Sequence, residues 1–261
     1  MIRFFDSRDK DAVISIWQEA FGDKKEDVSL FLEFLKDSIL VFEKDGRVVS
    51  MLTLLGVSIG IDKGRYVYAV ATDKAFRKKG YAGELIEYAK RFIVQNNEKF
   101  LVLLPQEEKL YRFYKKYGFC ELYCAENKST KINLNETTTQ KAEIITVIEY
   151  FTFRKTYFQN KKFVEWDIKT LEFMKNAYNG KFLIMRDGEK ICGAAFSYTA
   201  KDRVVVAELL TLENQAENLK AIGAFYRMNK LDCICASQEG DRFAMIYPRE
   251  YEDSYFGLGM K

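Results

Sequence analysis

Hydrophobic and polar positions near the start of the chain predict two helices followed by a hairpin. Apolar side chains recur at helical spacing in 11–21 and again in 28–35, which is the pattern of two amphipathic helices. Two apolar, partly β-branched runs, 39–43 and 48–55, then flank an Asp-Gly pair at 45–46. Because Asp-Gly favours the tight turn between antiparallel strands, these runs predict a hairpin.

Strands and helices alternate along the rest of the first half. An apolar run over 66–71 predicts a strand, which leads through a polar turn into a helix over 82–94. A short apolar run at 100–104 predicts a buried strand, and 107–117 predicts a further helix that ends at Gly118 in a left-handed cap. This order of elements predicts an α/β (α+β) fold, in which a mixed, mainly antiparallel sheet is flanked by helices.

The second half of the chain resembles the first. A gapless shift of 142 positions (187 − 45 = 142) places the Asp-Gly pair at 187–188 on the pair at 45–46, and places apolar residues 182–184 on 40–42. A strand predicted over 203–210 then follows the second hairpin. A helix followed by a hairpin is common, so coincidence stays an alternative, but the matching order of elements favours two tandem copies of one fold.

A polar stretch separates the two halves. Between 125 and 140 only Ala125, Ile132 and Leu134 are apolar, so we expect the boundary region at 136–142, with an edge strand of the first domain in part of the stretch as an alternative. The prediction is therefore a first domain over 1–135 and a degenerate second copy over 143–261.

Composition excludes several classes of protein. Of 261 residues 48% are apolar and 15% aromatic, which excludes an intrinsically disordered chain. The net charge of +3 (41 − 38) is too small to predict a nucleic-acid or membrane partner, even where lysines 78, 79, 115 and 116 lie near aromatic residues. Neither a signal peptide nor an apolar run long enough to cross a membrane is recognised, so we expect a cytoplasmic protein.

The chain contains no histidine, and this removes much of the common enzyme chemistry. A Ser-His-Asp triad, a Cys-His dyad and an imidazole base are all excluded. Cysteines show no spacing typical of a zinc site, so we expect no metal and reduced, buried thiols at Cys120, Cys124, Cys192, Cys233 and Cys235.

The segment 68–85 combines a strand, a basic turn and the start of a helix, which together favour an anion site. N–H groups at a helix N-terminus point outward, and the helix dipole adds positive potential there. Gly80 and Ala82 lack bulk at the place where a diphosphate would approach, and Arg77, Lys78 and Lys79 supply charged donors around it. A solvated turn with Gly80 present only for its backbone angles is the alternative. Neither a Walker loop nor a dinucleotide fingerprint is present.

Two motifs in this half resemble those of the GNAT acyltransferase superfamily. R-x-x-G-x-A at 77–82 follows a Val-Ala-Thr strand end and is similar to the acetyl-CoA loop of that family. Phe-Tyr-x-x-x-Gly-Phe at 113–119, preceded by a strand end at 104–107, is similar to its second hallmark. The resemblance is strong over 1–135, and the second half shares only the order of elements.

The resemblance implies an acyl-CoA dependent N-acyltransferase, most simply an acetyltransferase with acetyl-CoA as acyl donor. Strand residues 70–72 would pair with the pantetheine arm and turn residues 77–82 would hold the diphosphate through backbone groups. The cofactor-binding residues are then Val70, Ala71, Thr72, Arg77, Lys78, Lys79, Gly80, Tyr81 and Ala82. Tyr114 would be the catalytic general acid for the leaving thiolate, although its aromatic neighbours alone favour a core tyrosine.

Direct attack of a primary amine on the thioester is the implied mechanism, with a strand N–H stabilising the oxyanion. The general base is left open among the carboxylates and water. A phenol and a departing thiolate differ in pKa, and hydrogen bonding in a water-poor cleft is expected to bring them closer. The acceptor is expected to be an amine-bearing small molecule or protein, and the sequence is compatible with a homodimer.

The sequence departs from the family in two places. Lys74 stands where the family often has proline, which loosens the argument for the turn. In the second half, 211–219 has no arginine or glycine and carries two carboxylates, so we do not expect it to bind coenzyme A. We expect the second half to wall the acceptor cleft or support assembly. A non-catalytic acyl-CoA-binding regulatory module is the alternative function.

Overall fold

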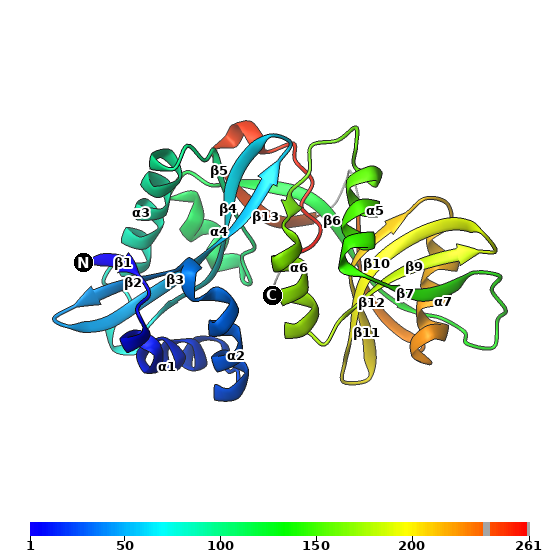
Figure 1. Ribbon diagram of the computed structural model, residues 1–261, viewed down its shortest axis with the longest axis horizontal. Coiled ribbons are helices and arrows are strands. Elements are labelled where there is room, and N and C mark those ends of the chain that lie inside the picture. The colour runs from blue at the N-terminus through cyan, green and yellow to red at the C-terminus, as the bar shows by residue number, and fades with distance from the viewer. Residues whose placement is uncertain (237–240, 260–261) are drawn as a thin grey trace. The chain divides into compact units, whose positions relative to one another are not determined.

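The computed structural model of the chain describes residues 1–236 and 241–259. These residues form two compact units (Figure 1). The first unit comprises Met1–Glu121 and Ala244–Glu252, and the second comprises Leu122–Phe243 and the segment that starts at Asp253. Both contain a mixed sheet flanked by helices, as the hydrophobic pattern predicts.

The sheet of the first unit is antiparallel except at one pair of strands. Its order is β1–β2–β3–β4–β5–β13, and only β4 and β5 run parallel. The strands are β1 (Ile2–Phe4), β2 (Ile39–Lys44), β3 (Arg47–Ile59), β4 (Asp62–Thr72), β5 (Phe100–Leu103) and β13 (Asp241–Tyr247), whose residues from Met245 to Tyr247 pair with β5.

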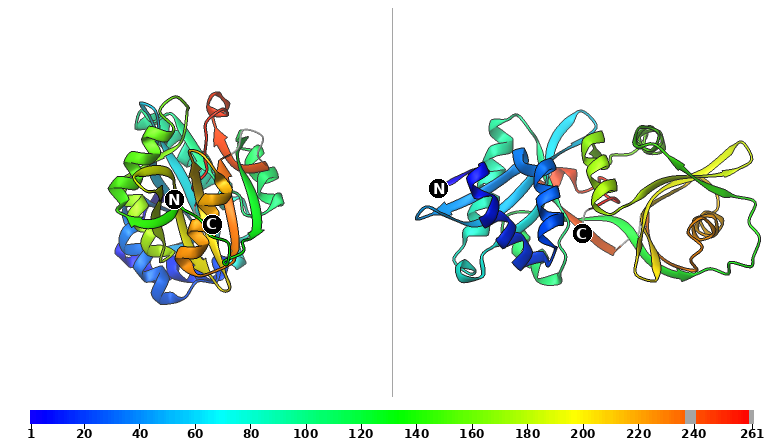
Figure 2. Two further views of the ribbon diagram at one scale, coloured as in Figure 1. Left: turned by 90° about the vertical axis from the view of Figure 1, so that its right-hand side faces the viewer. Right: turned by 60° about the horizontal axis from the view of Figure 1, so that its bottom comes forward.

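Helices cover both faces of this sheet (Figures 1 and 2). On one face, Trp17 of the first helix lies edge-on to Tyr68 of β4, with ring centroids 5.8 Å apart. On the other, Leu85 and Ile86 pack against Leu52 and Val67 in one buried cluster. The helices are α1 (Lys10–Phe21) and α2 (Lys25–Leu35) on the first face, and α3 (Tyr81–Gln95) and α4 (Glu108–Lys115) on the second; η1 (Ser7–Asp9), η2 (Lys36–Ser38), η3 (Lys74–Phe76) and η4 (Arg249–Tyr251) are short 3-10 turns.

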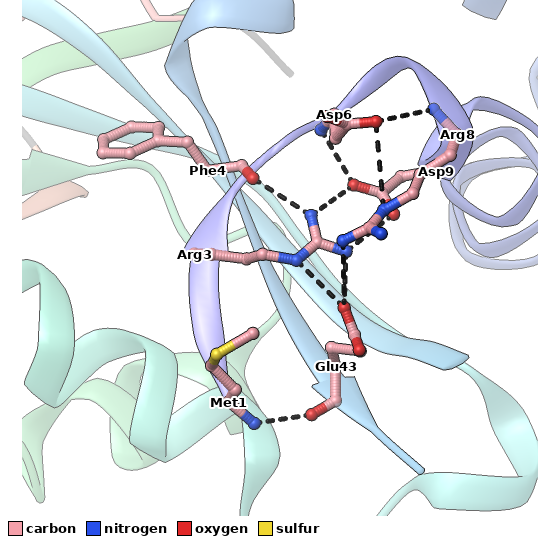
Figure 3. Close-up of polar contacts among 7 residues, drawn as sticks. All are labelled: Met1, Arg3, Phe4, Asp6, Arg8, Asp9 and Glu43. Atoms are coloured by element: carbon pink, nitrogen blue, oxygen red, sulfur yellow. Dashed lines mark hydrogen bonds and ion pairs between the residues drawn. The ribbon is translucent and has the colours of Figure 1, made fainter. Parts of the chain in front are cut away.

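A cluster of charged side chains fixes β1 and the start of α1 to β2 (Figure 3). The Arg3 guanidinium donates two hydrogen bonds to Asp9, of 2.6 and 2.9 Å, and also donates to Glu43 Oε2 at 2.6 and 2.9 Å. The Asp6 N–H donates to Asp9 Oδ2 at 2.8 Å, which completes a capping box at η1. Arg3 of β1 therefore joins its own strand to η1, at the start of α1, and to β2.

The second unit has the same plan. Its sheet order is β6–β12–β11–β10–β9–β7, in which only β11 and β12 are parallel. Helix α7 lies within the curve of the strands and α5 and α6 lie outside it, as the right-hand view of Figure 2 shows. The elements are β6 (Cys120–Lys131), β7 (Lys141–Ile145), α5 (Val147–Tyr157), β8 (Glu165–Trp166), α6 (Ile168–Ala177), β9 (Lys181–Asp187), β10 (Lys190–Ala200), β11 (Arg203–Thr211), α7 (Gln215–Tyr226) and β12 (Lys230–Ala236).

Both Asp-Gly pairs lie in hairpin turns. Gly46 and Gly188 have φ of +73° and +60°, a left-handed conformation that glycine adopts without strain. The first pair joins β2 to β3, and the second joins β9 to β10. The duplicated fold inferred from the sequence is confirmed.

The division of the chain differs from the domain ranges expected from the sequence, 1–135 and 143–261. The polar stretch from Ala125 to Lys131 pairs with β12 of the second unit, so it is a strand there and not a linker or an edge strand of the first unit. Met245–Tyr247 add a strand to the first unit beside β5. Pairings between segments so distant in sequence leave no local hydrophobic signature.

Candidate active site

Strand β4 has one edge that is paired over only part of its length. Its pairing with β5 runs from Gly64–Phe100 to Val67–Leu103 and ends there. Its pairing with β3 on the other side continues to Thr72. Within the described part of the chain, no strand therefore pairs with the β5-side edge of β4 between Tyr68 and Thr72. We call this stretch the open edge.

A bulge lies at the start of the open edge. Tyr68 pairs with Thr53 and Ala71 pairs with Met51, so Ala69 and Val70 stand together opposite Leu52. Ala69 has φ of +50°, which is strained for a residue with a Cβ. Because a bulge bends its strand and redirects backbone groups, this one turns β4 away from β5 where their pairing ends.

Backbone polar groups at the end of β4 alternate between its two sides. The Asp73 N–H donates to Val49 O of β3 at 3.0 Å, which places the polar groups of Thr72 on the open edge. The Thr72 carbonyl there accepts a hydrogen bond of 2.9 Å from Arg77 Nε. Ser50 Oγ contacts both Ala71 O and Thr72 Oγ1 at 2.8 Å, which fixes this end of the strand against β3.

The turn at 73–80 is held by charged and aromatic side chains. Asp73 Oδ1 accepts from the Ala75 N–H at 2.9 Å, and Asp73 Oδ2 accepts from Arg47 at the start of β3. The Arg47 guanidinium and the Lys79 ammonium both lie over the Phe76 ring, at 5.4 and 4.9 Å from its centroid. The cations of this turn are thus partly committed to cation–π contacts.

Helix α3 begins without a side-chain cap. Gly80 at its N-cap has φ of +91°, and Lys78 has φ of +63°. The first hydrogen bond of the helix runs from the Glu84 N–H to Gly80 O at 3.0 Å. None of the N–H groups of 80–83 donates to a group in the described residues, so these donors and the helix dipole are suited to binding an anion.

Glycine at position 80 is required by backbone angle and not by lack of space. A Cβ built there would meet nothing within 4 Å, but its φ of +91° is one that other residues rarely adopt. Gly83, which the sequence did not single out, is required by space: a Cβ there would lie 1.9 Å from the Tyr117 hydroxyl. The missed signal is the small residue at the second position of the helix predicted over 82–94.

The side chains of the predicted cofactor-binding residues are used in different ways. Arg77 is bound to Thr72 and lies 3.6 Å from a carboxylate oxygen of Glu19, so it is not a free donor for a diphosphate as the sequence suggested. The Tyr81 side chain is buried, and its hydroxyl accepts from Lys44 Nζ at 3.0 Å. Lys78 is exposed, with no side-chain contact to other described residues. The site therefore depends on backbone N–H groups, with Lys78 as its uncommitted cation.

Tyr114 of α4 is a core residue and also lies near the point where β4 and β5 diverge. It is 6% exposed and belongs to the same buried cluster as Val67 and Leu103, the last pair of the two strands; Val70 of the bulge packs against that cluster. Burial raises the pKa of the Tyr114 phenol above its usual value. The hydroxyl is therefore neutral, and it donates to no group in the described residues. From the sequence we expect the pKa values of the phenol and the departing thiolate to come closer, whereas burial moves the phenol pKa in the opposite direction.

A second neutral tyrosine lies on the opposite face of β4. Tyr68, the first residue of the open edge, is edge-on to Trp17, and Trp17 Nε1 donates to Asp23 Oδ2 at 2.8 Å. Burial, and then the nearby Asp23 charge, raise the pKa of Tyr68 above its usual value. Sequence reasoning missed Tyr68 because it reads as an ordinary strand aromatic.

Neither a cluster of metal ligands nor a membrane-spanning helix occurs among the residues that the structure describes. No group of three or more Cys, Asp or Glu side chains there is arranged to hold a metal ion. No helix within 1–236 and 241–259 has the length and apolarity needed to cross a membrane.

Comparison with known proteins identifies the first unit. Residues 1–122 match the model of the acetyltransferase (GNAT) domain. No curated protein matches the chain significantly by sequence. Among solved structures, a GCN5-related N-acetyltransferase from Anabaena variabilis superposes with a TM-score of 0.74 at 14% identity, over 94% of this chain and 72% of that chain. One from Kribbella flavida gives 0.66 at 12%, over 94% and 70%.

A duplicated structure is also similar. A tandem GNAT protein from the clavulanic acid biosynthesis pathway superposes with a TM-score of 0.60 at 10% identity, over 94% of this chain and 98% of that chain. Identities this low establish fold and not activity. Both units of the chain have the GNAT fold, and residues 1–122 match the GNAT acetyltransferase domain model.

Proposed function

We propose that the chain is a cytoplasmic N-acetyltransferase that moves an acetyl group from acetyl-CoA to a primary amine. The observation that carries the proposal is the combination of an uncapped helix N-terminus with an adjacent open strand edge. The first is suited to a diphosphate and the second to an extended chain containing amides. Acetyl-CoA carries a diphosphate, followed by a pantetheine arm that contains amides and ends at the thioester.

The residues of the first unit fit such a ligand. N–H groups from Lys78 to Ala82 would hold the diphosphate, and the Lys78 ammonium would add charge. The backbone between Val70 and Thr72 would pair with the pantetheine arm, because its polar groups on the open edge include the Thr72 N–H. Tyr81 would contribute through its backbone N–H, since its side chain is engaged by Lys44, and the Arg77 side chain is partly engaged by Thr72.

Acetyl-CoA supplies an activated acyl group, and the chain supplies orientation, an oxyanion donor and a proton. The amine attacks the thioester carbonyl, a strand N–H on the open edge stabilises the oxyanion, and the C–S bond then breaks. The proton on the Tyr114 hydroxyl passes to the sulfur. Burial raises the pKa of Tyr114, which makes it a weak acid, and the same burial would also raise the pKa of a thiolate held beside it. The base that accepts the amine proton stays open.

A coenzyme A release assay over a panel of small and peptidyl primary amines tests this function, run beside calorimetry with acetyl-CoA. We expect heat of binding for acetyl-CoA and release with at least one class of amine. Binding without release on any amine favours the alternative of a regulatory acyl-CoA-binding module. Absence of binding contradicts both.

A further inference from the structure

We propose that Glu19 of α1 is a positioning residue, which holds the turn 73–80 in the conformation that binds the diphosphate of acyl-CoA. The inference rests on the function proposed above and adds to it a residue from outside both sequence motifs. Glu19 precedes the turn by more than fifty positions and belongs to a different element of the first unit.

One carboxylate oxygen joins α1 to both ends of η3. The Lys74 N–H donates to Glu19 Oε2 at 2.9 Å, and Arg77 Nη2 lies 3.6 Å from the same oxygen. Through its Nε, Arg77 also donates to Thr72 O at 2.9 Å. Glu19 therefore ties the helix to the turn directly, and to the last residue of β4 through Arg77.

The turn has a second anchor on its other side. Asp73 is bound by Arg47 of β3, and the Phe76 ring lies against the same guanidinium. Arg47 and Glu19 thus hold the turn from β3 and α1 respectively. With Glu19 removed, the segment from Lys74 to Gly80 would keep the β3 anchor, the hydrogen bond from Arg77 to Thr72, the ring contact of Phe76 with Tyr81 and its own internal bonds, but it would lose its anchor on α1. The N–H groups proposed to face the ligand begin at its end.

Lys74, which stands where the family often has proline, supplies the backbone N–H that binds Glu19. A proline at this position has no N–H and could not donate to Glu19. Asp73 has ψ of 132°, a value that the residue before a proline also adopts, so the backbone at this place is compatible with either residue. What the lysine adds is its backbone donor, and Glu19 is the group that uses it.

A purely electrostatic role for Glu19 would have the opposite sign. Its negative charge lies beside Arg77 at the edge of a site for a dianionic group, so by charge alone its removal would tighten binding. A positioning role predicts weaker binding on removal, because ordering the turn must then be driven by the ligand. The direction of the change therefore decides between the two roles.

Four variants separate the backbone bond, the charge and the side chains. Glu19→Ala removes both contacts, and Glu19→Gln keeps an oxygen acceptor for the Lys74 N–H without the charge. Lys74→Pro removes the N–H, and Lys74→Ala is its matched control, since it removes the same side chain and keeps the donor. Glu26→Ala, on the exposed surface of α2, controls for the loss of an acid from this region.

Hydrogen exchange of the ligand-free protein and calorimetry with coenzyme A are the two measurements. We expect Glu19→Ala and Lys74→Pro to speed amide exchange within 75–80 and to weaken coenzyme A binding by about three- to tenfold, the effect of losing one or two modest polar contacts. Glu19→Gln, Lys74→Ala and Glu26→Ala are expected to resemble the wild type more closely in both measurements.

Unchanged exchange in Glu19→Ala, or binding that is equal or tighter, overturns the positioning role. A wild-type chain that binds coenzyme A together with that result contradicts this inference alone. A wild-type chain that does not bind coenzyme A contradicts the proposed function, and the purpose assigned to Glu19 with it, even where exchange changes as expected.

Discussion

Helices α3 and α7 occupy the same place in the two units, yet their N-termini differ. Helix α3 starts at Gly80, which has no side chain to accept from the first N–H groups. Helix α7 starts after Asn214, whose side-chain oxygen accepts from the N–H groups of Ala216 and Glu217 at 3.0 and 3.3 Å. One unit leaves these donors to a ligand and the other satisfies them itself. The N-cap residue is therefore one feature that leaves the donors of α3 open to an anion and closes those of α7.

The strands before these helices also differ, because β4 is left unpaired on one edge over a longer stretch than β11. Pairing of β4 with β5 ends at Val67, well before β4 itself ends, whereas pairing of β11 with β12 reaches Leu209, close to the end of β11 at Thr211. The connection to the helix also shortens, from 73–80 in the first unit to 212–214 in the second. Within its described residues, the second unit has neither an unpaired stretch as long as the open edge nor a turn as long as 73–80.

On the sheet face that α5 covers in the second unit, buried polar side chains bind one another. Glu208 of β11 is fully buried, and its carboxylate accepts from Arg154 at 2.8 and 3.1 Å, from Tyr150 at 2.6 Å and from Tyr255 at 3.3 Å. Arg154 also donates to Val164 O at 2.7 Å. On the corresponding face of the first unit, Tyr68 packs against Trp17 at the open edge. On this face the second unit therefore holds a satisfied, buried ion pair, where the first unit holds two aromatic rings.

The largest expected effect is on catalysis in the first unit. Tyr114→Phe removes the proposed acid and keeps the ring, so kcat is expected to fall by about 10²- to 10⁴-fold. Acetyl-CoA affinity is expected to be nearly unchanged, because the hydroxyl makes no hydrogen bond within the described residues and the ring stays in its cluster. Steady-state kinetics measures kcat, and calorimetry measures the affinity for acetyl-CoA. Tyr88→Phe on α3 is the matched control, since it removes a hydroxyl from the same unit outside the site. Full turnover in Tyr114→Phe would exclude its role as acid.

The next largest effect is on stability in the second unit. Arg154→Met leaves the Glu208 carboxylate buried without its cation, and the free energy of unfolding is expected to fall by about 3–5 kcal/mol in urea titrations. Replacing both members, Arg154→Met with Glu208→Leu, is expected to recover most of this loss, because neither charge is then left unpaired. A loss below about 1 kcal/mol in the single variant would show that the cluster is not the internal support described above.

The two N-caps can be compared directly by one pair of substitutions. Gly80→Ala forces a Cβ into a left-handed conformation at a cost of about 1–2 kcal/mol, and it is expected to weaken coenzyme A binding as the turn shifts. Asn214→Ala removes the side-chain cap of α7 and is expected to cost about 1 kcal/mol of stability with no change in binding. Calorimetry and thermal unfolding on both variants test the contrast, and weaker binding in Asn214→Ala would contradict it.

The smallest expected effect is a pH dependence confined to the first unit. Burial opposes ionisation of Asp9, but hydrogen bonds from Arg3 and the Asp6 N–H outweigh it, so the pKa of Asp9 lies below its usual value. Its contribution to stability is therefore present above about pH 4, the unfolded value, and is lost as the pH falls through the lower folded value. Asp9→Asn is expected to be less stable at neutral pH and to show less of this acid-induced loss. An unchanged acid transition in Asp9→Asn would mean that other carboxylates determine it.

Local patterns predicted much of the fold. Helical periodicity located α1 and α3, and the two Asp-Gly pairs located both hairpins, because these signals depend on neighbours in sequence. Gly118 was expected to end α4 in a left-handed conformation, and it has φ of +84°. The polar strand β6 was read as a boundary region, since its pairing with β12 lies about a hundred residues away.

The site was predictable only in its backbone. The glycine and basic residues of 77–82 indicated an anion site, but the use of the Arg77 side chain depends on Glu19 and Thr72, which pattern alone does not bring together. The bulge at Ala69 and the end of strand pairing at Val67 follow from sheet register, which one strand's sequence does not determine. The aromatic pattern around Tyr114 is consistent with both a core and a catalytic residue, because in this fold it lies in the core beside the open edge.

A crystal structure of the protein with coenzyme A tests the comparison of the two units most directly. The account predicts diphosphate density at the N–H groups of 78–82, with the pantetheine arm along β4 from Val70 to Thr72, and no ligand at the start of α7. Density at Asn214–Glu217, or a diphosphate bound away from α3 in the first unit, would contradict it.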